Sequence, residues 1–127
     1  MAVHYRVHPR PNPQDREAPA KYYATAVLQG ETNLDTLANA ISHQCSLTRS
    51  DCYAVLVALE DNLMEELQAG RSVKLGRIGS FRVSLTSEGM PTATEVNPTK
   101  FKQQKIIFKP AKALQSMLKK LRYKKLK

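Results

Sequence analysis

The run Lys74-Leu-Gly-Arg-Ile-Gly-Ser-Phe-Arg-Val83 follows a long helical pattern and leads into an alternating one. Gly76 and Gly79 bracket a turn that has Arg77 at its tip. Because glycine tolerates conformations closed to other residues, the chain can reverse tightly here and offer backbone N–H groups and a cation to a phosphate. A plain connection between a helix and a strand has the same appearance, so the flanking residues must decide its meaning.

The residues after this turn predict a strand, an arm and a second strand. Phe81, Val83 and Leu85 alternate with Arg82, Ser84 and Thr86, which is the period of a half-buried strand. Residues 88–99 contain glycine, prolines and threonines, so we expect a loop or arm there. In the second strand, 102–109, alternation places Ile106 and Phe108 on one face and Lys105, Ile107 and Lys109 on the other.

A short amphipathic helix is predicted to close this region. Pro110 suits the first position of a helix, and the apolar residues that follow have helical spacing: Leu114, Met117, Leu118 and Leu121.

Two helices are predicted before the turn. Asn33 offers an N-cap for a short helix that ends near residues 43–46, and Thr48 with Asp51 forms the start of a capping box for a longer one. Gly70 ends the second helix. Its apolar stripe consists of Cys52, Val55, Leu56, Leu59, Leu63 and Leu67. The two helices form a hairpin, and a chain this short has little else to cover the stripe, which favours dimerisation.

The N-terminal residues form a separate unit of strands. Residues 3–8 alternate between apolar and polar side chains, and Pro9, Pro11 and Pro13 are expected to end that strand. Residues 21–27 are rich in aromatic and β-branched side chains, which indicates a second strand.

The basic residues are concentrated at one end of the chain. The formal net charge is +9 over 127 residues, and residues 100–127 contain eleven Lys or Arg and no acid. Residues 1–99 hold nine basic and eleven acidic side chains. Such segregation is typical of proteins that neutralise phosphates, although a solvated tail or a contact with an anionic membrane would give the same pattern.

Several classes of protein are disfavoured. The sequence has neither an apolar stretch long enough to span a membrane nor a signal-peptide core, so we expect a cytoplasmic protein. Cys45 and Cys52 lack metal-site spacing and are expected to be small, partly buried apolar residues; His4 and His8 are expected on an edge strand. The sequence has no catalytic motif, so we expect neither enzymatic activity nor a cofactor.

Two segments carry a resemblance to a known family. Val73–Val83 resembles the Val-x-Leu-x-Gly-Phe-Gly-Thr-Phe-x-Val run of the HU/IHF family of histone-like, nucleoid-associated DNA-binding proteins. Phe108-Lys-Pro-Ala-Lys-Ala-Leu114 is similar to that family's closing Phe-x-x-Gly-Lys-x-Leu. The resemblance covers a DNA-binding domain of residues 31–122. Residues 1–30 form an added N-terminal strand extension, as in longer HU-like variants, and 123–127 a basic tail.

The resemblance implies an α+β fold with a helical-hairpin base, an antiparallel β saddle, an arm and a short C-terminal helix. It also implies an intertwined homodimer that binds duplex DNA in the nucleoid and contributes to DNA condensation. Arg77 and Gly79 would lie near the saddle, and Lys112 matches the family's phosphate-contacting lysine. Strand alternation and charge add four candidate DNA-binding residues: Arg82, Lys102, Lys105 and Lys109.

The arm departs from the family pattern. Asn97 and Pro98 resemble part of the Arg-Asn-Pro arm tip, whose proline wedges into the minor groove, but Val96 replaces the arginine. Residues 88–99 contain two glutamates and no cation. We therefore expect binding to rest on the saddle and tail, with little base readout and limited bending.

Other roles remain open at this point. An HU-fold structural or protein-interaction module with weak nucleic-acid binding is the main alternative to a sequence-tolerant architectural protein, and RNA is a further possible partner.

Overall fold

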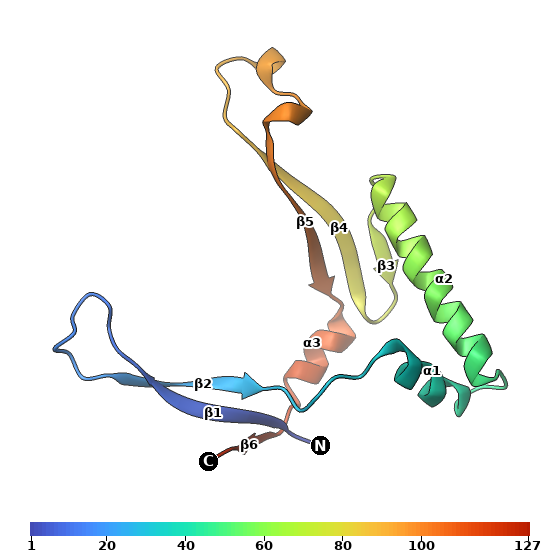
Figure 1. Cartoon of the computed structure of the whole chain (residues 1–127), viewed down its shortest axis with the longest axis horizontal. Coiled ribbons are helices and arrows are strands. Elements are labelled where there is room, and N and C mark those ends of the chain that lie inside the picture. The colour runs from blue at the N-terminus through green and yellow to red at the C-terminus, as the bar shows by residue number, and fades with distance from the viewer. The chain divides into compact units, whose positions relative to one another are not determined.

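A computed structural model describes residues 1–127 and divides into two compact units. One unit comprises residues 1–33 together with 117–127, and the other comprises residues 34–116. Figure 1 shows the elements, which are β1 (Val3–Arg10), β2 (Lys21–Val27), α1 (Leu34–Ser42), α2 (Arg49–Gln68), β3 (Val73–Leu75), β4 (Gly79–Ser87), β5 (Phe101–Pro110), α3 (Lys112–Leu118) and β6 (Tyr123–Lys125). The chain is therefore an α+β protein, as predicted.

The helical hairpin of α1 and α2 is fixed by local sequence signals. Thr48 and Asp51 form the predicted capping box: the Thr48 hydroxyl accepts the Asp51 N–H at 3.1 Å, and the Asp51 carboxylate accepts the Thr48 N–H at 3.3 Å. At the other end of α2, the Gly70 N–H donates to Leu67 and the Arg71 N–H to Glu66, with Gly70 at φ +82°. This pattern is a Schellman motif, and it confirms the predicted stop at Gly70.

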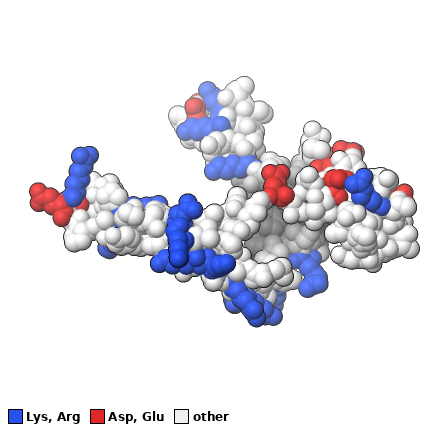
Figure 2. Space-filling model, turned by 60° about the horizontal axis from the view of Figure 1, so that its bottom comes forward, with Lys and Arg blue, Asp and Glu red and all other residues white.

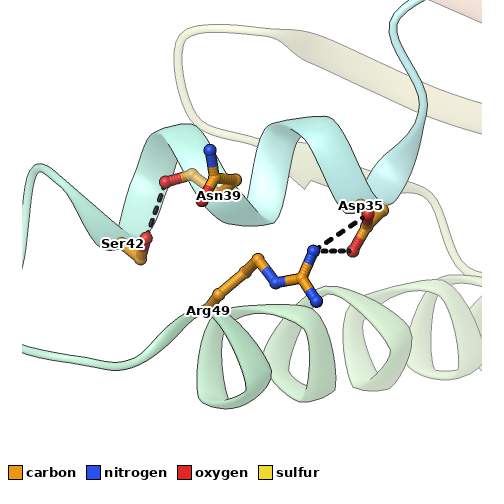
Figure 3. Close-up of polar contacts among 4 residues, drawn as sticks. All are labelled: Asp35, Asn39, Ser42 and Arg49. Atoms are coloured by element: carbon orange, nitrogen blue, oxygen red, sulfur yellow. Dashed lines mark hydrogen bonds and ion pairs between the residues drawn. The ribbon is translucent and has the colours of Figure 1, made fainter.

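One ion pair ties the two helices together. The Arg49 guanidinium, at the start of α2, lies 3.2 Å from the Asp35 carboxylate in the first turn of α1 (Figure 3). Both side chains are more than half exposed, so the pair orients the hairpin more than it stabilises it.

The second sheet has the order β3-β4-β5 and is antiparallel throughout. The glycine-bracketed turn of residues 76–79 joins β3 and β4 in a hairpin, in which Leu75 pairs with Gly79 across the turn. Phe81 pairs with Phe108 and Val83 with Ile106, so these side chains share an apolar face. The predicted alternation in both long strands is confirmed, and α2 lies against β3 and β4 on the helical side of the unit.

The N-terminal sheet has the order β2-β1-β6. β2 has the predicted bounds, but the predicted end of the first strand at residue 8 is wrong, because β1 continues through Pro9 to Arg10 and stops before Pro11. Proline fits there because the pairing of β1 with β6 covers only Val3 to Tyr5. The edge of β1 at Pro9 is therefore free and needs no N–H donor. The residues expected as a tail include β6, which pairs in parallel with β1.

The last helix also differs in its start. Pro110 ends β5 instead of opening the helix, and α3 begins at Lys112, with the Ala111 carbonyl accepting the Gln115 N–H at 3.0 Å.

A single chain buries almost no core. Only two apolar residues are buried, Ala38 at 0% exposure and Cys52 at 2%. On the predicted stripe of α2, Val55 is 58% exposed and Leu59 41%. Burial of apolar surface is the main favourable term in folding, so a lone chain lacks most of the expected stabilisation.

Candidate nucleic-acid interface

The β3–β4 turn opens onto a basic hollow in the unit formed by residues 34–116. The hollow has a volume of about 630 Å³, and its lining contains four cations and no acid. The cations are Lys74, Arg77, Lys109 and Lys112. We call this set the basic hollow.

Strand register brings two of these lysines together. Lys74 on β3 pairs with Ser80 on β4, and Ser80 pairs with Lys109 on β5. The three residues therefore form one row across the sheet, on the face opposite Phe81 and Phe108. The small Ser80 side chain between the two lysines leaves the row open.

A backbone hydrogen bond brings the other two cations to the same place. The Ala111 N–H donates to the Ile78 carbonyl at 3.0 Å, which joins the β3–β4 turn to the start of α3. Arg77 directly precedes Ile78, and Lys112 directly follows Ala111. The turn of residues 76–79 is therefore held beside Lys112, which is predicted from the sequence to contact phosphate.

The cations of the hollow are free to meet an anion. All four are exposed, and both ion pairs of the protein lie elsewhere, between Arg49 and Asp35 and between Arg71 and Glu66. In Figure 2 some acidic side chains lie over the helices at the right of the view, and others lie at the left end and at the top. Clustered, unneutralised cations produce the positive potential that attracts phosphate.

The remaining predicted site residues divide into two groups. Arg82 pairs with Ile107 and Lys105 with Ser84, so both continue the cationic face of the sheet beyond the hollow. Lys102 is the extra residue of a β-bulge, since Thr86 pairs with Gln103 and Ser87 with Phe101. A bulged residue does not follow the strand alternation, so Lys102 is not placed with the others.

Lys74 was not among the predicted site residues. Three residues of β3 are too few to show a period, so only the pairing with β4 reveals which face Lys74 occupies.

Gly79 lines the hollow, but it serves packing. A Cβ at this position would overlap the Lys109 carbonyl oxygen and lie 2.8 Å from the Phe108 ring. Gly79 also has φ +152°, which other residues rarely adopt. The bare backbone therefore lets β4 and β5 approach closely, which holds Lys109 in the row.

The candidate arm tip is structured by its own residues. Asn97 caps a short 3-10 turn over Pro98–Lys100, and its side-chain oxygen accepts the Thr99 N–H at 3.0 Å and also the Thr99 hydroxyl. Asn97 and Pro98 lie on the exposed connection between β4 and β5. The connection also contains a second 3-10 turn, Ala93–Glu95.

The other candidate chemistry is sparse. The Sγ atoms of Cys45 and Cys52 lie 3.9 Å apart without a disulfide. The pKa of the Cys52 thiol is raised, chiefly by burial and to a smaller extent by the contact with Cys45. Cys45 is exposed, contrary to the expectation of partial burial. No three His, Cys, Asp or Glu side chains gather as metal ligands would, and no helix has the length and apolarity needed to cross a bilayer.

The fold and the hollow together define an HU-like chain. The model of a family described as an HU domain fused to a winged helix-turn-helix, Ig or glycine-rich motif matches residues 1–125. The chain therefore belongs to this family of HU-domain proteins, and the resemblance inferred from the two motifs is confirmed. A search of curated proteins found no match.

Solved structures support the same fold. A Bacteroides vulgatus protein described as a candidate DNA-binding protein has a TM-score of 0.68 at 13% identity, over 98% of this chain and 48% of its own. Anabaena HU in complex with DNA has a TM-score of 0.54 at 23% identity, over 68% of this chain and 97% of its own. A Thermotoga maritima HU variant has a TM-score of 0.52 at 21% identity, with coverage of 68% and 99%. This chain spans about half the length of the Bacteroides protein.

Proposed function

We propose that this protein is a sequence-tolerant, histone-like DNA-binding protein that contacts duplex phosphates through the basic hollow. The hollow carries the proposal, because four exposed cations surround it without an acid or an internal ion pair. Membership of an HU-domain family supports it, as does the likeness to Anabaena HU crystallised with DNA.

The mechanism follows from the kind of contact. Lysine and arginine on a sheet face neutralise phosphates and release condensed counterions, which gives affinity without base readout. Arg82 and Lys105 extend the contact along β4 and β5, and Lys102 adds charge near the arm. The proposed role is architectural and includes no catalytic step. We propose that the protein performs it in the nucleoid.

We also propose an intertwined homodimer. Apolar residues remain exposed on α2, on β4 and on β5; among them are Val55, Leu59, Met64, Val83, Leu85 and Ile106. A second copy presents the same surfaces and can cover them by twofold symmetry. Two basic hollows on one assembly would then engage one duplex.

A protein-interaction module is the competing function. The acidic arm, with Glu88 and Glu95 and no cation between residues 88 and 99, favours it, since such an arm is repelled by the minor groove. Capture of one stoichiometric partner together with negligible binding to duplex DNA would support this alternative over the first.

The decisive experiment is a titration of duplex DNA at two salt concentrations, read for stoichiometry, affinity and bending. If about six phosphates are neutralised, affinity should fall about a thousandfold between roughly 50 and 200 mM salt. A matched RNA duplex in competition tests the choice of nucleic acid. Salt-insensitive affinity, or no binding at low salt, would refute the proposal.

A paired variant tests the hollow itself. Arg77→Ala with Lys112→Ala should weaken binding uniformly across DNA sequences and lower the salt slope by about two, because each phosphate contact contributes about one. Arg16→Ala with Arg71→Ala removes the same charge outside the hollow and should leave the slope unchanged. Equal effects of the two pairs would show that only net charge matters.

A further inference from the structure

We propose that the N-terminal sheet carries a second surface for the phosphate backbone of duplex DNA, an inference that rests on the proposed DNA-binding function. The surface is one face of the sheet β2-β1-β6, and it is distinct from the basic hollow, which belongs to the other unit. We call it the N-terminal basic face; its members are His4, Arg6, His8, Arg10, Lys21 and Lys124.

Strand register puts these residues on one face. Residues 4, 6, 8 and 10 of β1 alternate away from Val3, Tyr5 and Val7. Arg10 pairs with Lys21 of β2, and His4 pairs with Lys124 of β6. The parallel strand β6 therefore adds a cation that the sequence pattern had assigned to a tail.

The arrangement is unfavourable unless an anion is present. Arg10 and Lys21 lie directly opposite each other, and like charges in such a pair destabilise a sheet. No acid relieves them on this face, since Asp15 and Glu17 lie in the connection between the strands and Glu31 lies after β2. An ordinary solvated face would mix the two signs of charge.

One contact orients the site. The Arg10 guanidinium carbon lies 5.3 Å from the centre of the Tyr23 ring, and Tyr23 is on the same face because it pairs with His8. This cation–π contact keeps the guanidinium over the sheet while its N–H donors remain available. A planar guanidinium held in this way suits bidentate recognition of phosphate.

The dimensions favour an extended polyanion over a single small anion. Arg6 and Arg10 are four residues apart on one strand, which corresponds to roughly 13 Å at about 3.3 Å per residue. Extended side chains at these two positions present two separate cations, which successive phosphates of one nucleic-acid strand can contact together. The opposite face offers only apolar and small side chains around Tyr5, Ala24, Ala26 and Tyr123, with Lys125 at its margin.

The test compares two charge-matched double variants of the full chain. Arg6→Gln with Arg10→Gln removes two charges from the N-terminal basic face, whereas Arg16→Gln with Lys125→Gln removes two from the same unit outside that face. Binding to a duplex of about 40 base pairs is measured as a function of salt. We expect the first variant to lower the salt slope by about two and the affinity by more than tenfold near 0.1 M salt, and the second to alter neither.

A single variant guards against a folding defect. Lys21→Gln leaves β1 and the contact between Arg10 and Tyr23 unaltered, and should lower the slope by about one. Thermal unfolding of each variant confirms that the fold is retained.

The outcomes separate the two proposals. If wild-type protein fails to bind duplex DNA at low salt, the proposed function fails and this inference fails with it. A second outcome is that wild-type binding depends on Arg77 and Lys112, whereas the salt slope is unchanged in the Arg6→Gln, Arg10→Gln double variant and in Lys21→Gln. In that case only this inference is overturned. If these variants lose binding only to an RNA duplex or only to anionic vesicles, the inference is likewise overturned in favour of those partners.

Discussion

Gly79 is the residue at which the fold and the candidate site depend on each other. It begins β4, lies against the backbone of β5 and lines the basic hollow. Its importance therefore comes from the absence of a side chain, which allows the row of Lys74, Ser80 and Lys109 to form. Arg77 and Lys112 supply charge at the same place, but the hollow also depends on the close approach of β4 to β5 at Gly79.

Replacing Gly79 with alanine should destabilise the protein. The new Cβ would overlap the Lys109 carbonyl oxygen, and alanine is strained at φ +152°, so we expect a loss of about 1–3 kcal/mol in the free energy of unfolding. Chemical denaturation measures it. Gly89→Ala is the control, because a Cβ at Gly89 meets nothing within 4 Å. An unchanged denaturation midpoint for Gly79→Ala would contradict the packing role.

The elements differ in how they are specified. α2 begins and ends on local signals, the capping box at Thr48 and the Schellman motif at Gly70, so its bounds follow from residues close in sequence. β6 and the start of α3 follow from pairing and packing with distant residues. The arm between β4 and β5 lies between these cases, with turns ordered by local caps such as Asn97.

Removing the N-cap of α2 should weaken the helical hairpin. Thr48→Ala deletes the oxygen that accepts the Asp51 N–H, which should cost about 1 kcal/mol of stability. Ser50→Ala, in the same turn, is the matched control, since Ser50 caps nothing. Thermal unfolding of both variants measures the difference, and equal melting temperatures would show that the cap is not needed.

The arm should contribute little to DNA bending. Pro98→Ala should leave the bend nearly intact, because the acidic segment 88–99 does not favour entry into the minor groove. Fluorescence transfer between the ends of a labelled duplex measures the bend. Val96→Arg adds a cation beside Asn97 and should instead raise the affinity. A large loss of bending in Pro98→Ala would show that the proline intercalates.

At the scale of the whole molecule, a single chain leaves many large apolar side chains exposed. Only the apolar side chains of Ala38 and Cys52 are buried, and the exposed apolar side chains on α2, β4 and β5 include Val55, Leu85 and Ile106. The proposed assembly of two copies would account for this exposure, because a second copy can cover apolar side chains that stay exposed within one chain.

Stability should therefore depend on protein concentration. If the folded state is a homodimer, the melting temperature should rise with concentration, as mass action requires. Val55→Asn on the exposed face of α2 should shift the sedimentation profile towards the monomer and lower the melting temperature. Leu28→Asn is the control, because Leu28 is exposed and lies outside the helices. A melting temperature independent of concentration, with a monomeric sedimentation coefficient, would contradict dimerisation.

The sequence by itself determined the elements whose signals are local. Neighbouring residues specify the caps at Thr48 and Gly70, the turn around Arg77 and the alternation of Phe81, Val83 and Leu85. Two motifs were enough to predict the family. The tertiary structure alone decided that Lys74 joins Arg77, Lys109 and Lys112, that Lys102 lies in a bulge, and that residues 123–125 complete the N-terminal sheet. Those features depend on strand register and on hydrogen bonds between distant segments, which local periodicity does not encode.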